Sequence, residues 1–467
     1  MRYISTRGQS PEISFDEAAL RGLAPDGGLY MPKEWPRFSK DDLIAMQGLS
    51  YVEIAKQVIK PFVGNSIQTS VLDNIIENAY SKFYHQAICP LTQIDSNDWI
   101  MEQFHGPTLA FKDVAMCFLA PLLDHLLDVR QSRSTIVVAT SGDTGSAAVD
   151  AFKGAENIDL YVLLPKGRVS EVQQRQMTTS NAENVHPLLI EGTFDDCQNL
   201  VKSMFSHDVF REKIKLSGVN SINWGRIVAQ SVYYVYAAIQ LGAPHRPVSF
   251  CVPTGNFGNI FAAYVARQMG IEIEELIIAS NQNDILPRTL ETGRHEMSGV
   301  EQSQSPSMDI QISSNFERFL FELSGRDAHM ISGFMNQLKQ SGSFNLPEDI
   351  WSNLKNEMKA DRASEAEMAT RIKSVYDKCG YLLDPHTAVG YDVAIKQRLK
   401  KETPLVTLST AHPAKFPDAV EKASGQIPNL PNFLSDLYER EEAYEILPNA
   451  LDAVETYILN TARSIQG

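Results

Sequence analysis

The sequence lacks the features that mark several classes of protein. Its five cysteines are dispersed and form no CxxC pair, which favours reduced thiols over a disulfide framework. Its ten histidines form no HxxxH pattern, so no metal site is expected. No apolar run approaches the ~18 residues of a membrane span, and the N-terminus has no apolar signal core. We therefore expect a cytoplasmic protein with no membrane contact.

The chain is also short of basic residues. It has 42 Lys and Arg residues against 57 Asp and Glu residues, for a formal net charge of -15. Because nucleic acids are bound by an excess of Lys and Arg, no nucleic-acid partner is expected. A small phosphorylated ligand remains compatible with this charge, since one local cationic pocket can hold it.

What the sequence does contain is an ordinary globular composition. It has 467 residues, of which 43% are apolar and 21% charged. Residues 1–95 show helical apolar spacing, with Ser at several helix starts, and predict an N-terminal helical domain. In 96–290, short β-branched runs alternate with helical segments, which predicts an α/β core with a parallel sheet and a smaller substrate-side subdomain. Residues 291–467 are expected to add a helical insertion and complete the large α/β domain.

Individual segments carry further expectations. Strands are predicted in STIVVAT, IDLYVLL, VHPLLI, RPVSFCVPT, IEELIIAS and TPLVTLST. The polar stretch 292–309 predicts a mobile surface loop or a lid. Residues 430–467 are acidic and are expected to be helical, with a packing role.

Lys112 stands out because it lies inside an apolar stretch. Read as a helix, residues 104–116 place Lys112 on an apolar face with Thr108 and Leu109. Asp113 falls on the opposite face, with the solvated aspartates. Burial lowers the pKa of an amine, and a neutral amine can form a Schiff base with an aldehyde. The commoner alternative is a lysine whose stem packs while its amine reaches solvent.

Three turns after predicted strands offer polar groups. ATSGDTGSAA (139–148) has hydroxyls and amides at a helix start, and the glycines of PTGNFGNI (253–260) let the backbone approach an anion. TLSTAHPAKF (407–416) places Ser409 and Thr410 at a strand end. Each turn alone could be a helix cap or a tight connection, and neither GxGxxG nor the P-loop pattern is present. With a reactive lysine, the three turns supply what pyridoxal phosphate requires: an imine partner, a phosphate site and a ring-nitrogen partner.

These motifs resemble those of threonine synthase, a fold-type II pyridoxal phosphate enzyme of the tryptophan-synthase-β-like family. The resemblance is carried by YISTRG, LAPDGGLYMP, FHGPTLAFKD, TSGDTGSAA, LPKGRVSEVQQRQM, PTGNFGN and STAHPAKF. It covers nearly the whole chain, in the longer form with an extra N-terminal helical domain. It implies pyridoxal 5'-phosphate as cofactor and the conversion of O-phospho-L-homoserine and water to L-threonine and phosphate, the last step of threonine biosynthesis. Phosphate would leave by γ-elimination, and water would add at the β-carbon.

The resemblance also implies a role for each matching residue. Lys112 would be the catalytic residue and would bind the cofactor. The other cofactor-binding residues would be Asp143, Gly255, Asn256, Phe257, Gly258, Asn259 and Thr410, with Ser409 as the alternative at the ring nitrogen. Asp143 replaces the Asn of shorter family members, so its contact is open. The substrate would be bound by Thr140, Ser141, Gly142 and Thr144 at its carboxylate and by Ser221 and Arg226 at its phosphate.

Other activities fit the same fold. A phospho-homoserine lyase or a serine/threonine dehydratase would use the same cofactor, and the Ser221 and Arg226 pair favours a phosphorylated substrate. A binding protein without chemistry is disfavoured by Lys112 and the glycine turn. We expect a small-molecule substrate and a monomer or homodimer.

Overall fold

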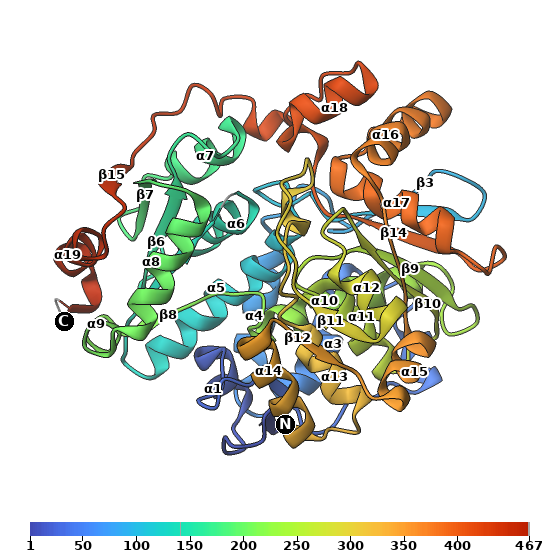
Figure 1. Cartoon of the computed structure of the whole chain (residues 1–467), viewed down its shortest axis with the longest axis horizontal. Coiled ribbons are helices and arrows are strands. Elements are labelled where there is room, and N and C mark those ends of the chain that lie inside the picture. Colours follow the sequence, from blue (N-terminus) through green and yellow to red (C-terminus); the bar gives the residue numbers. More distant parts are fainter. Residues whose placement is uncertain (141, 466–467) are drawn as a thin grey trace. The chain divides into compact units, whose positions relative to one another are not determined.

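Two parallel sheets hold the strands that the sequence predicts. The structure is a computed structural model that describes residues 1–140 and 142–465. It divides into two units, each with one of these sheets (Figure 1). Helices pack against both sheets, so the predicted α/β class is confirmed. The domain limits expected at residues 95 and 290 stay a prediction.

The first unit comprises Met1–Ile76, Phe83–His105 and Ser221–Pro428. Its six-stranded sheet has the order β13-β10-β9-β14-β4-β3, in which only β3 and β4 pair antiparallel. The strands are β3 Leu91–Gln93, β4 Asp98–Glu102, β9 Val248–Pro253, β10 Ile273–Ser280, β13 Lys359–Arg362 and β14 Leu405–Ser409. Since β9 and β14 are parallel neighbours, the turns that follow them leave the sheet at the same edge.

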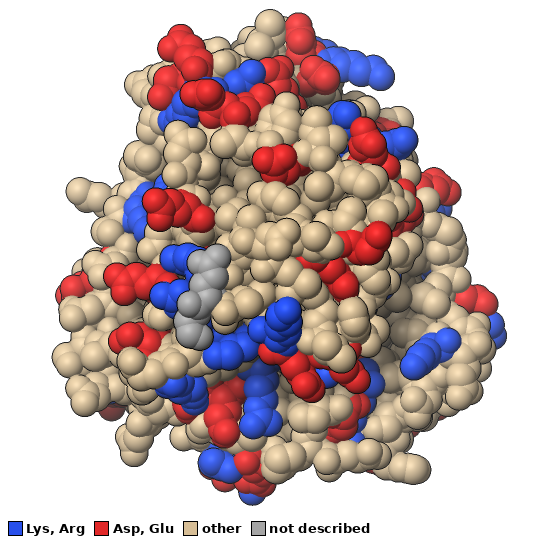
Figure 2. Space-filling view, turned by 90° about the vertical axis from the view of Figure 1, so that its left-hand side faces the viewer, with Lys and Arg blue, Asp and Glu red and all other residues tan. Residues whose placement is uncertain are grey.

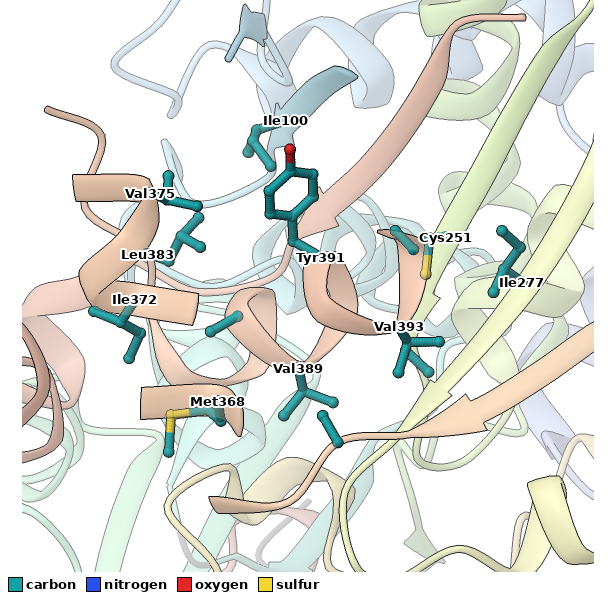
Figure 3. Close-up of a cluster of buried hydrophobic side chains, with 14 of the residues drawn as sticks. Ile100, Cys251, Ile277, Met368, Ile372, Val375, Leu383, Val389, Tyr391 and Val393 are labelled. Atoms are coloured by element: carbon teal, nitrogen blue, oxygen red, sulfur yellow. The ribbon is translucent and has the colours of Figure 1, made fainter. Parts of the chain in front are cut away.

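The core of this unit lies between its sheet and α17. Val389 and Val393 of α17 pack in one cluster with Cys251 of β9 and Ile277 of β10 (Figure 3). Helix α16 covers the other side of α17 with Met368 and further apolar side chains. The helices of this part are α10 Trp224–Gln240, α11 Gly258–Gln268, α12 Ile285–Thr292, α13 Phe316–Leu323, α14 Ala328–Ser341, α15 Glu348–Glu357, α16 Glu365–Cys379, α17 Pro385–Gln397, α18 Pro417–Ser424 and the 3-10 turns η1 Pro306–Met308 and η2 Pro413–Lys415.

The N-terminal region is mainly helical, as predicted. Its helices are α1 Phe15–Arg21, α2 Lys40–Ala45, α3 Tyr51–Val63 and α4 Thr69–Tyr80. Ser14, Ser39 and Ser50 cap the first three through capping boxes, which confirms the Ser caps read from the sequence. A short antiparallel pair, β1 Tyr3–Ser5 with β2 Tyr30–Pro32, was not predicted, because each strand has only three residues.

The second unit comprises Glu77–Lys82, Gly106–Asn220 and Asn429–Gly467. Its five-stranded parallel sheet has the order β15-β7-β6-β5-β8. The strands are β5 Ser134–Ala139, β6 Ile158–Pro165, β7 Val185–Glu191, β8 Leu216–Ser217 and β15 Glu445–Pro448. The helices are α5 Lys112–Val129, α6 Asp143–Phe152, α7 Glu171–Thr178, α8 Phe194–Ser206, α9 Asp208–Lys213, α19 Leu451–Thr461 and the 3-10 turns η3 Asn432–Leu434 and η4 Arg463–Ile465.

Two segments differ from their prediction. Residues 430–467 are not wholly helical, because Glu445–Pro448 forms β15, which extends the sheet beside β7. Residues 292–309 contain more regular structure than a surface loop, and the predicted mobility or lid role near the site stays a prediction. They include β11 Arg294–Glu296, which pairs with β12 Ser343–Asn345, and Asp309 accepts hydrogen bonds from the Asn281 and Asn283 amides.

The surface carries both signs of charge. Figure 2 shows Lys and Arg interspersed with Asp and Glu over one face, although acidic residues exceed basic ones in the whole sequence. Among the described residues, no helix combines the length and apolar character needed to cross a membrane. Residues 1–140 and 142–465 also contain no group of three His, Cys, Asp or Glu side chains arranged to hold a metal ion.

Candidate active site

Lys112 is the first residue of α5, and this position changes the interpretation of its neighbours. Leu109 has a φ of 62°, so the chain turns there and enters the helix only at residue 112. The predicted helical face shared with Thr108 and Leu109 is therefore wrong. The predicted exposure of Asp113 is also wrong, because its side chain is buried and accepts a 2.8 Å hydrogen bond from the Thr108 N–H. Asp113 thus fastens the turn that presents Lys112.

The Lys112 amine faces a carboxylate. Its Nζ lies 3.5 Å from Oδ2 of Asp143, and the two side chains are only 12% and 3% exposed. Asp143 opens α6, so its carboxylate lies at a helix N-terminus, where negative charge is favoured. Burial favours the neutral amine, whereas a carboxylate at this distance favours the charged one. Within this unit Asp143 forms an ion pair with Lys112, and its predicted contact with the cofactor stays a prediction.

Gln173 of α7 holds the other oxygen of Asp143. Its Nε2 donates to Oδ1 at 2.9 Å, and Ser170 Oγ donates to Gln173 Oε1 at 2.9 Å, which orients the amide. A Cβ on Gly142 would lie 2.4 Å from Nε2, so only glycine leaves room for this side chain. The sequence reasoning did not single out Gln173, although it lies in the LPKGRVSEVQQRQM motif.

The turn before α6 is fixed by Thr140. The Thr140 hydroxyl accepts hydrogen bonds from the N–H groups of Gly142 and Gly145, both at 3.1 Å. This capping explains why a threonine follows β5, and it leaves the carboxylate-binding roles of Thr140, Gly142 and Thr144 as predictions. Ser141, also predicted at this site, lies outside the described residues.

In the 253–260 turn, the carbonyls of Gly255 and Asn256 accept hydrogen bonds, whereas the amides of residues 255–259 are unused by the described residues. Gly255 O accepts from Ser313 Oγ at 2.6 Å, and Asn256 O accepts from the Asn315 N–H at 3.1 Å. Phe257, with φ of 62°, caps α11, which begins at Gly258. Within the described part of the chain, no hydrogen bond uses the N–H groups of residues 255–259. Phe257, Gly258 and Asn259 are buried, and because buried amides are almost always paired, this row of donors is suited to an anion.

Asn259 adds a side-chain donor at the start of α11. Its Oδ1 accepts from the Tyr234 hydroxyl at 2.8 Å, while its Nδ2 is buried and has no partner among the described residues. Gly255 is required by close packing, since a Cβ there would lie 2.5 Å from the Ser307 carbonyl oxygen. Unused backbone amides, an orphaned amide donor and a helix N-terminus together fit the phosphate of pyridoxal phosphate.

Ser409 is the last residue of β14 and Thr410 follows it, and the two have different surroundings. The Ser409 hydroxyl lies 2.9 Å from Thr387 Oγ1 of α17, and the Thr387 hydroxyl donates to the Asp384 carboxylate. Thr410 directly follows β14 and is also buried, but its hydroxyl forms no hydrogen bond with another described residue. This difference favours Thr410 over Ser409 for a ligand contact, and the ring-nitrogen role itself stays a prediction.

Arg226 is a buried cation near the start of α10. Its residue exposure is 3%, and burial lowers the pKa of its guanidinium to about 10, so it is still charged at neutral pH. Asn223 caps the helix by accepting from the Gly225 N–H at 2.9 Å. Ser221 precedes the cap and is half-buried. A buried guanidinium beside a helix N-terminus suits an anion, as predicted for a substrate phosphate.

Comparison with known proteins places the chain in a family. The family model "Threonine synthase N terminus" matches residues 2–80, "Pyridoxal-phosphate dependent enzyme" matches 89–410, and "Threonine synthase, C-terminal" matches 387–458. A threonine synthase of Pseudomonas aeruginosa is 49% identical, over 98% of both chains.

Solved structures agree. The chain resembles the structure of PLP-bound threonine synthase from Brucella melitensis with a TM-score of 0.98 and 56% identity, covering 99% of this chain and 100% of that one. The yeast threonine synthase structure matches with a TM-score of 0.94 and 37% identity, covering 98% of both chains. The predicted fold-type II architecture and the predicted cofactor are confirmed. The chain belongs to the threonine synthase family of pyridoxal-phosphate-dependent enzymes.

Proposed function

We propose that this enzyme converts O-phospho-L-homoserine and water to L-threonine and phosphate. The observation that carries the proposal is the full-length match to threonine synthases, which includes the N-terminal and C-terminal regions as well as the cofactor-binding part. The unused amides of residues 255–259 support it from the chain's own geometry. When bound, pyridoxal 5'-phosphate supplies an aldehyde for the amine and a ring that accepts electrons from the substrate.

Lys112 is the residue that would hold the cofactor and then move protons. Freed from the cofactor by the substrate's amine, its own amine would take a proton from Cα and then one from Cβ of the substrate. Phosphate would leave from Cγ, water would add its hydroxyl at Cβ, and the amine would give up each proton it takes, so that one proton returns to Cγ and one to Cα. Asp143 supports this role, because its carboxylate lies 3.5 Å from the Lys112 amine and can stabilise the protonated form of that amine.

The remaining residues would bind and orient. The backbone of Gly255, Asn256, Phe257, Gly258 and Asn259 would hold the cofactor phosphate, and the Thr410 hydroxyl would meet the ring nitrogen. Thr140, Ser141, Gly142 and Thr144 would bind the substrate carboxylate. Ser221 and Arg226 would bind the substrate phosphate, and this contact would separate the substrate from unphosphorylated serine or threonine. We further propose that the enzyme is cytoplasmic and that it is a monomer or a homodimer. Light scattering would test the oligomeric state.

The reaction and the attachment site can be tested together. Borohydride reduction followed by mass spectrometry should find the pyridoxyl group on the peptide that contains Lys112. Lys112→Ala should lower the rate of threonine formation at least about 10³-fold, because a group that both holds the cofactor and moves protons is lost. Lys166→Ala removes an exposed lysine of the same unit and should leave the rate unchanged.

The products decide between the alternatives. Threonine and phosphate in equal amounts support the proposal. Phosphate with 2-oxobutanoate in place of threonine would instead make the enzyme a lyase, and turnover of unphosphorylated threonine or serine would make it a dehydratase.

A further inference from the structure

One side chain joins the two segments that we assign to phosphate groups. Asn315, which is fully buried, donates through Nδ2 to the Asn256 carbonyl at 3.0 Å and to the Ser221 carbonyl at 3.2 Å. Its backbone N–H also donates to the Asn256 carbonyl. Asn256 lies in the turn with the unused amides, and Ser221 precedes α10. The carbonyls of both segments are thus turned toward Asn315, which leaves the amides of the turn free to face an anion.

Arg318 holds Asn315 in this orientation. It donates through Nη1 to Asn315 Oδ1, which fixes the amide with Nδ2 toward the two carbonyls. Its Nη2 donates to the Ile222 carbonyl at 2.6 Å, so it also grips the segment that contains Ser221. Burial lowers the pKa of Arg318 to about 9, and the side chain is therefore a cation at neutral pH. Among the described residues, every oxygen that accepts from it is a carbonyl or amide oxygen.

The N-terminal motifs hold this pair in turn. Arg318 Nε and Nη2 donate to the Tyr30 carbonyl of β2 at 3.1 and 3.0 Å. The neighbouring Glu317 accepts from the Thr6 hydroxyl at 2.6 Å and pairs with Arg7 at 3.1 Å. Thr6 and Arg7 lie in YISTRG, and Tyr30 lies in LAPDGGLYMP. The YISTRG motif therefore contacts Glu317, and the LAPDGGLYMP motif contacts Arg318, near the start of α13.

We propose that Asn315 and Arg318 are positioning residues for phosphate binding, and that the N-terminal region serves the reaction by holding them in place. The inference rests on the proposed function for the identity of the two phosphate groups. Arg318 fixes Asn315, and Asn315 fixes both the 255–259 turn and the segment before α10. The buried charge of Arg318 also favours a dianionic group in this unit, because little solvent screens it there.

The test compares two ligands that differ only in a phosphate. The full-length apoenzyme is titrated with pyridoxal 5'-phosphate and with pyridoxal, and the dissociation constants are measured by absorbance. Arg318→Met removes the charge and the donors. Asn315→Asp keeps the acceptor for Arg318 but turns a carboxylate oxygen toward the two carbonyls. Both variants should weaken pyridoxal 5'-phosphate binding about tenfold or more and pyridoxal binding less than about threefold.

Arg326→Met is the matched control. Arg326 also donates to N-terminal carbonyls, those of Pro32 and Lys33, but among the described residues it forms no hydrogen bond with the 255–259 turn. The dissociation constant of the Arg326→Met variant for pyridoxal 5'-phosphate should be within about twofold of the wild-type value. Arg318→Lys keeps the charge but not the fork of donors, so its dissociation constant for pyridoxal 5'-phosphate should lie between those of wild type and Arg318→Met. This variant replaces Arg318→Met in the test if the methionine variant does not fold.

Two results would overturn the inference. One is unchanged cofactor affinity in folded Arg318 and Asn315 variants, and the other is an equal loss for pyridoxal and pyridoxal 5'-phosphate, which would indicate a general structural role. The proposed function fails by a different result: a wild-type enzyme that binds pyridoxal 5'-phosphate tightly but makes no threonine. In that case the ratio of the binding constants would still decide the inference.

Discussion

The contacts of the Asp143 carboxylate show how neighbouring residues hold the Lys112 amine. One oxygen faces the Lys112 amine and the other accepts from Gln173. Gln173 is itself oriented by Ser170, so two hydrogen bonds lead from the start of α7 to the carboxylate that forms the ion pair with the amine. A neutral amide is well suited here, because it donates to the carboxylate without adding a second charge to a buried place.

Replacing Gln173 should therefore change the surroundings of the Lys112 amine through Asp143, although we find no direct role for Gln173 at that amine. In Gln173→Leu, a buried oxygen of Asp143 loses its donor, which costs about 1–3 kcal/mol and lets the carboxylate reorient. We expect kcat to fall about tenfold and the visible absorption band of the bound cofactor to shift.

Gln174→Leu gives the matched control, since Gln174 lies on the same helix but donates to Glu442 instead. A Gln173 variant that lost thermal stability yet kept the wild-type spectrum and kcat would limit the residue to packing.

At the scale of elements, the 253–260 turn shows how packing imposes the backbone of a binding site. Gly255→Ala would bring a Cβ to 2.5 Å from the Ser307 carbonyl oxygen, so the turn or η1 must shift. We expect the dissociation constant of pyridoxal 5'-phosphate to rise about tenfold or more, measured by absorbance titration. Gly333→Ala is the comparison, because Gly333 lies inside α14 with open space at its Cβ. It should raise the free energy of unfolding by roughly 0.5–1 kcal/mol and leave cofactor binding unchanged.

Elements with their own local signal could be predicted from the sequence, and those made by their neighbours could not. The long apolar strands such as β6 and β10 were predicted because buried parallel strands are continuously apolar. The strand β13, Lys359–Arg362, has no such signal and forms only by pairing with β10. In the same way β15 gains its partner in β7, across more than 200 residues of chain.

The residues of the candidate site differ in the same way, because some lie in compact sequence motifs and others do not. Lys112 and the 255–259 turn lie in compact motifs, so their identity could be read directly. Asn315 and Arg318 could not be found that way, because they act through partners that are distant in sequence, such as Tyr30 and Ser221. The Asp113 prediction failed for a related reason: helical periodicity was continued through a turn that Leu109 imposes.

For the whole molecule, the N-terminal region and the residues that follow α12 share one unit. Contacts of Arg318 with Tyr30, and of Glu317 with Thr6 and Arg7, span about three hundred residues of sequence. Long-range contacts therefore connect the N-terminal region to the residues that we propose to position the phosphate-binding segments. Because these contacts join distant parts of the sequence, we expect this unit to unfold cooperatively.

One buried and one half-buried histidine, His295 and His412, should make that unit sensitive to acid. Burial lowers the pKa of both His295 and His412 to about 4. His295 stacks between Phe316 and Phe344, with ring centroids 5.3 and 4.9 Å away, and lies within hydrogen-bond distance of the Thr289 hydroxyl. In the unfolded chain a histidine titrates near pH 6.5, so between about pH 4 and 6.5 the unfolded state binds more protons. Stability is therefore complete above about pH 6.5 and falls as the pH drops toward 4.

Each histidine should cost about 2 kcal/mol between pH 8 and pH 5, from the difference between its folded and unfolded pKa values. His295→Phe keeps the stacking with the flanking rings and removes the titrating group. Its midpoint of urea unfolding should consequently change less between pH 8 and pH 5 than that of the wild type. The exposed His329, replaced by Asn, should keep the full wild-type difference. Equal pH dependence in wild type and His295→Phe would show that protonation of this buried ring does not drive the acid loss, and that the ring is already charged in the folded unit.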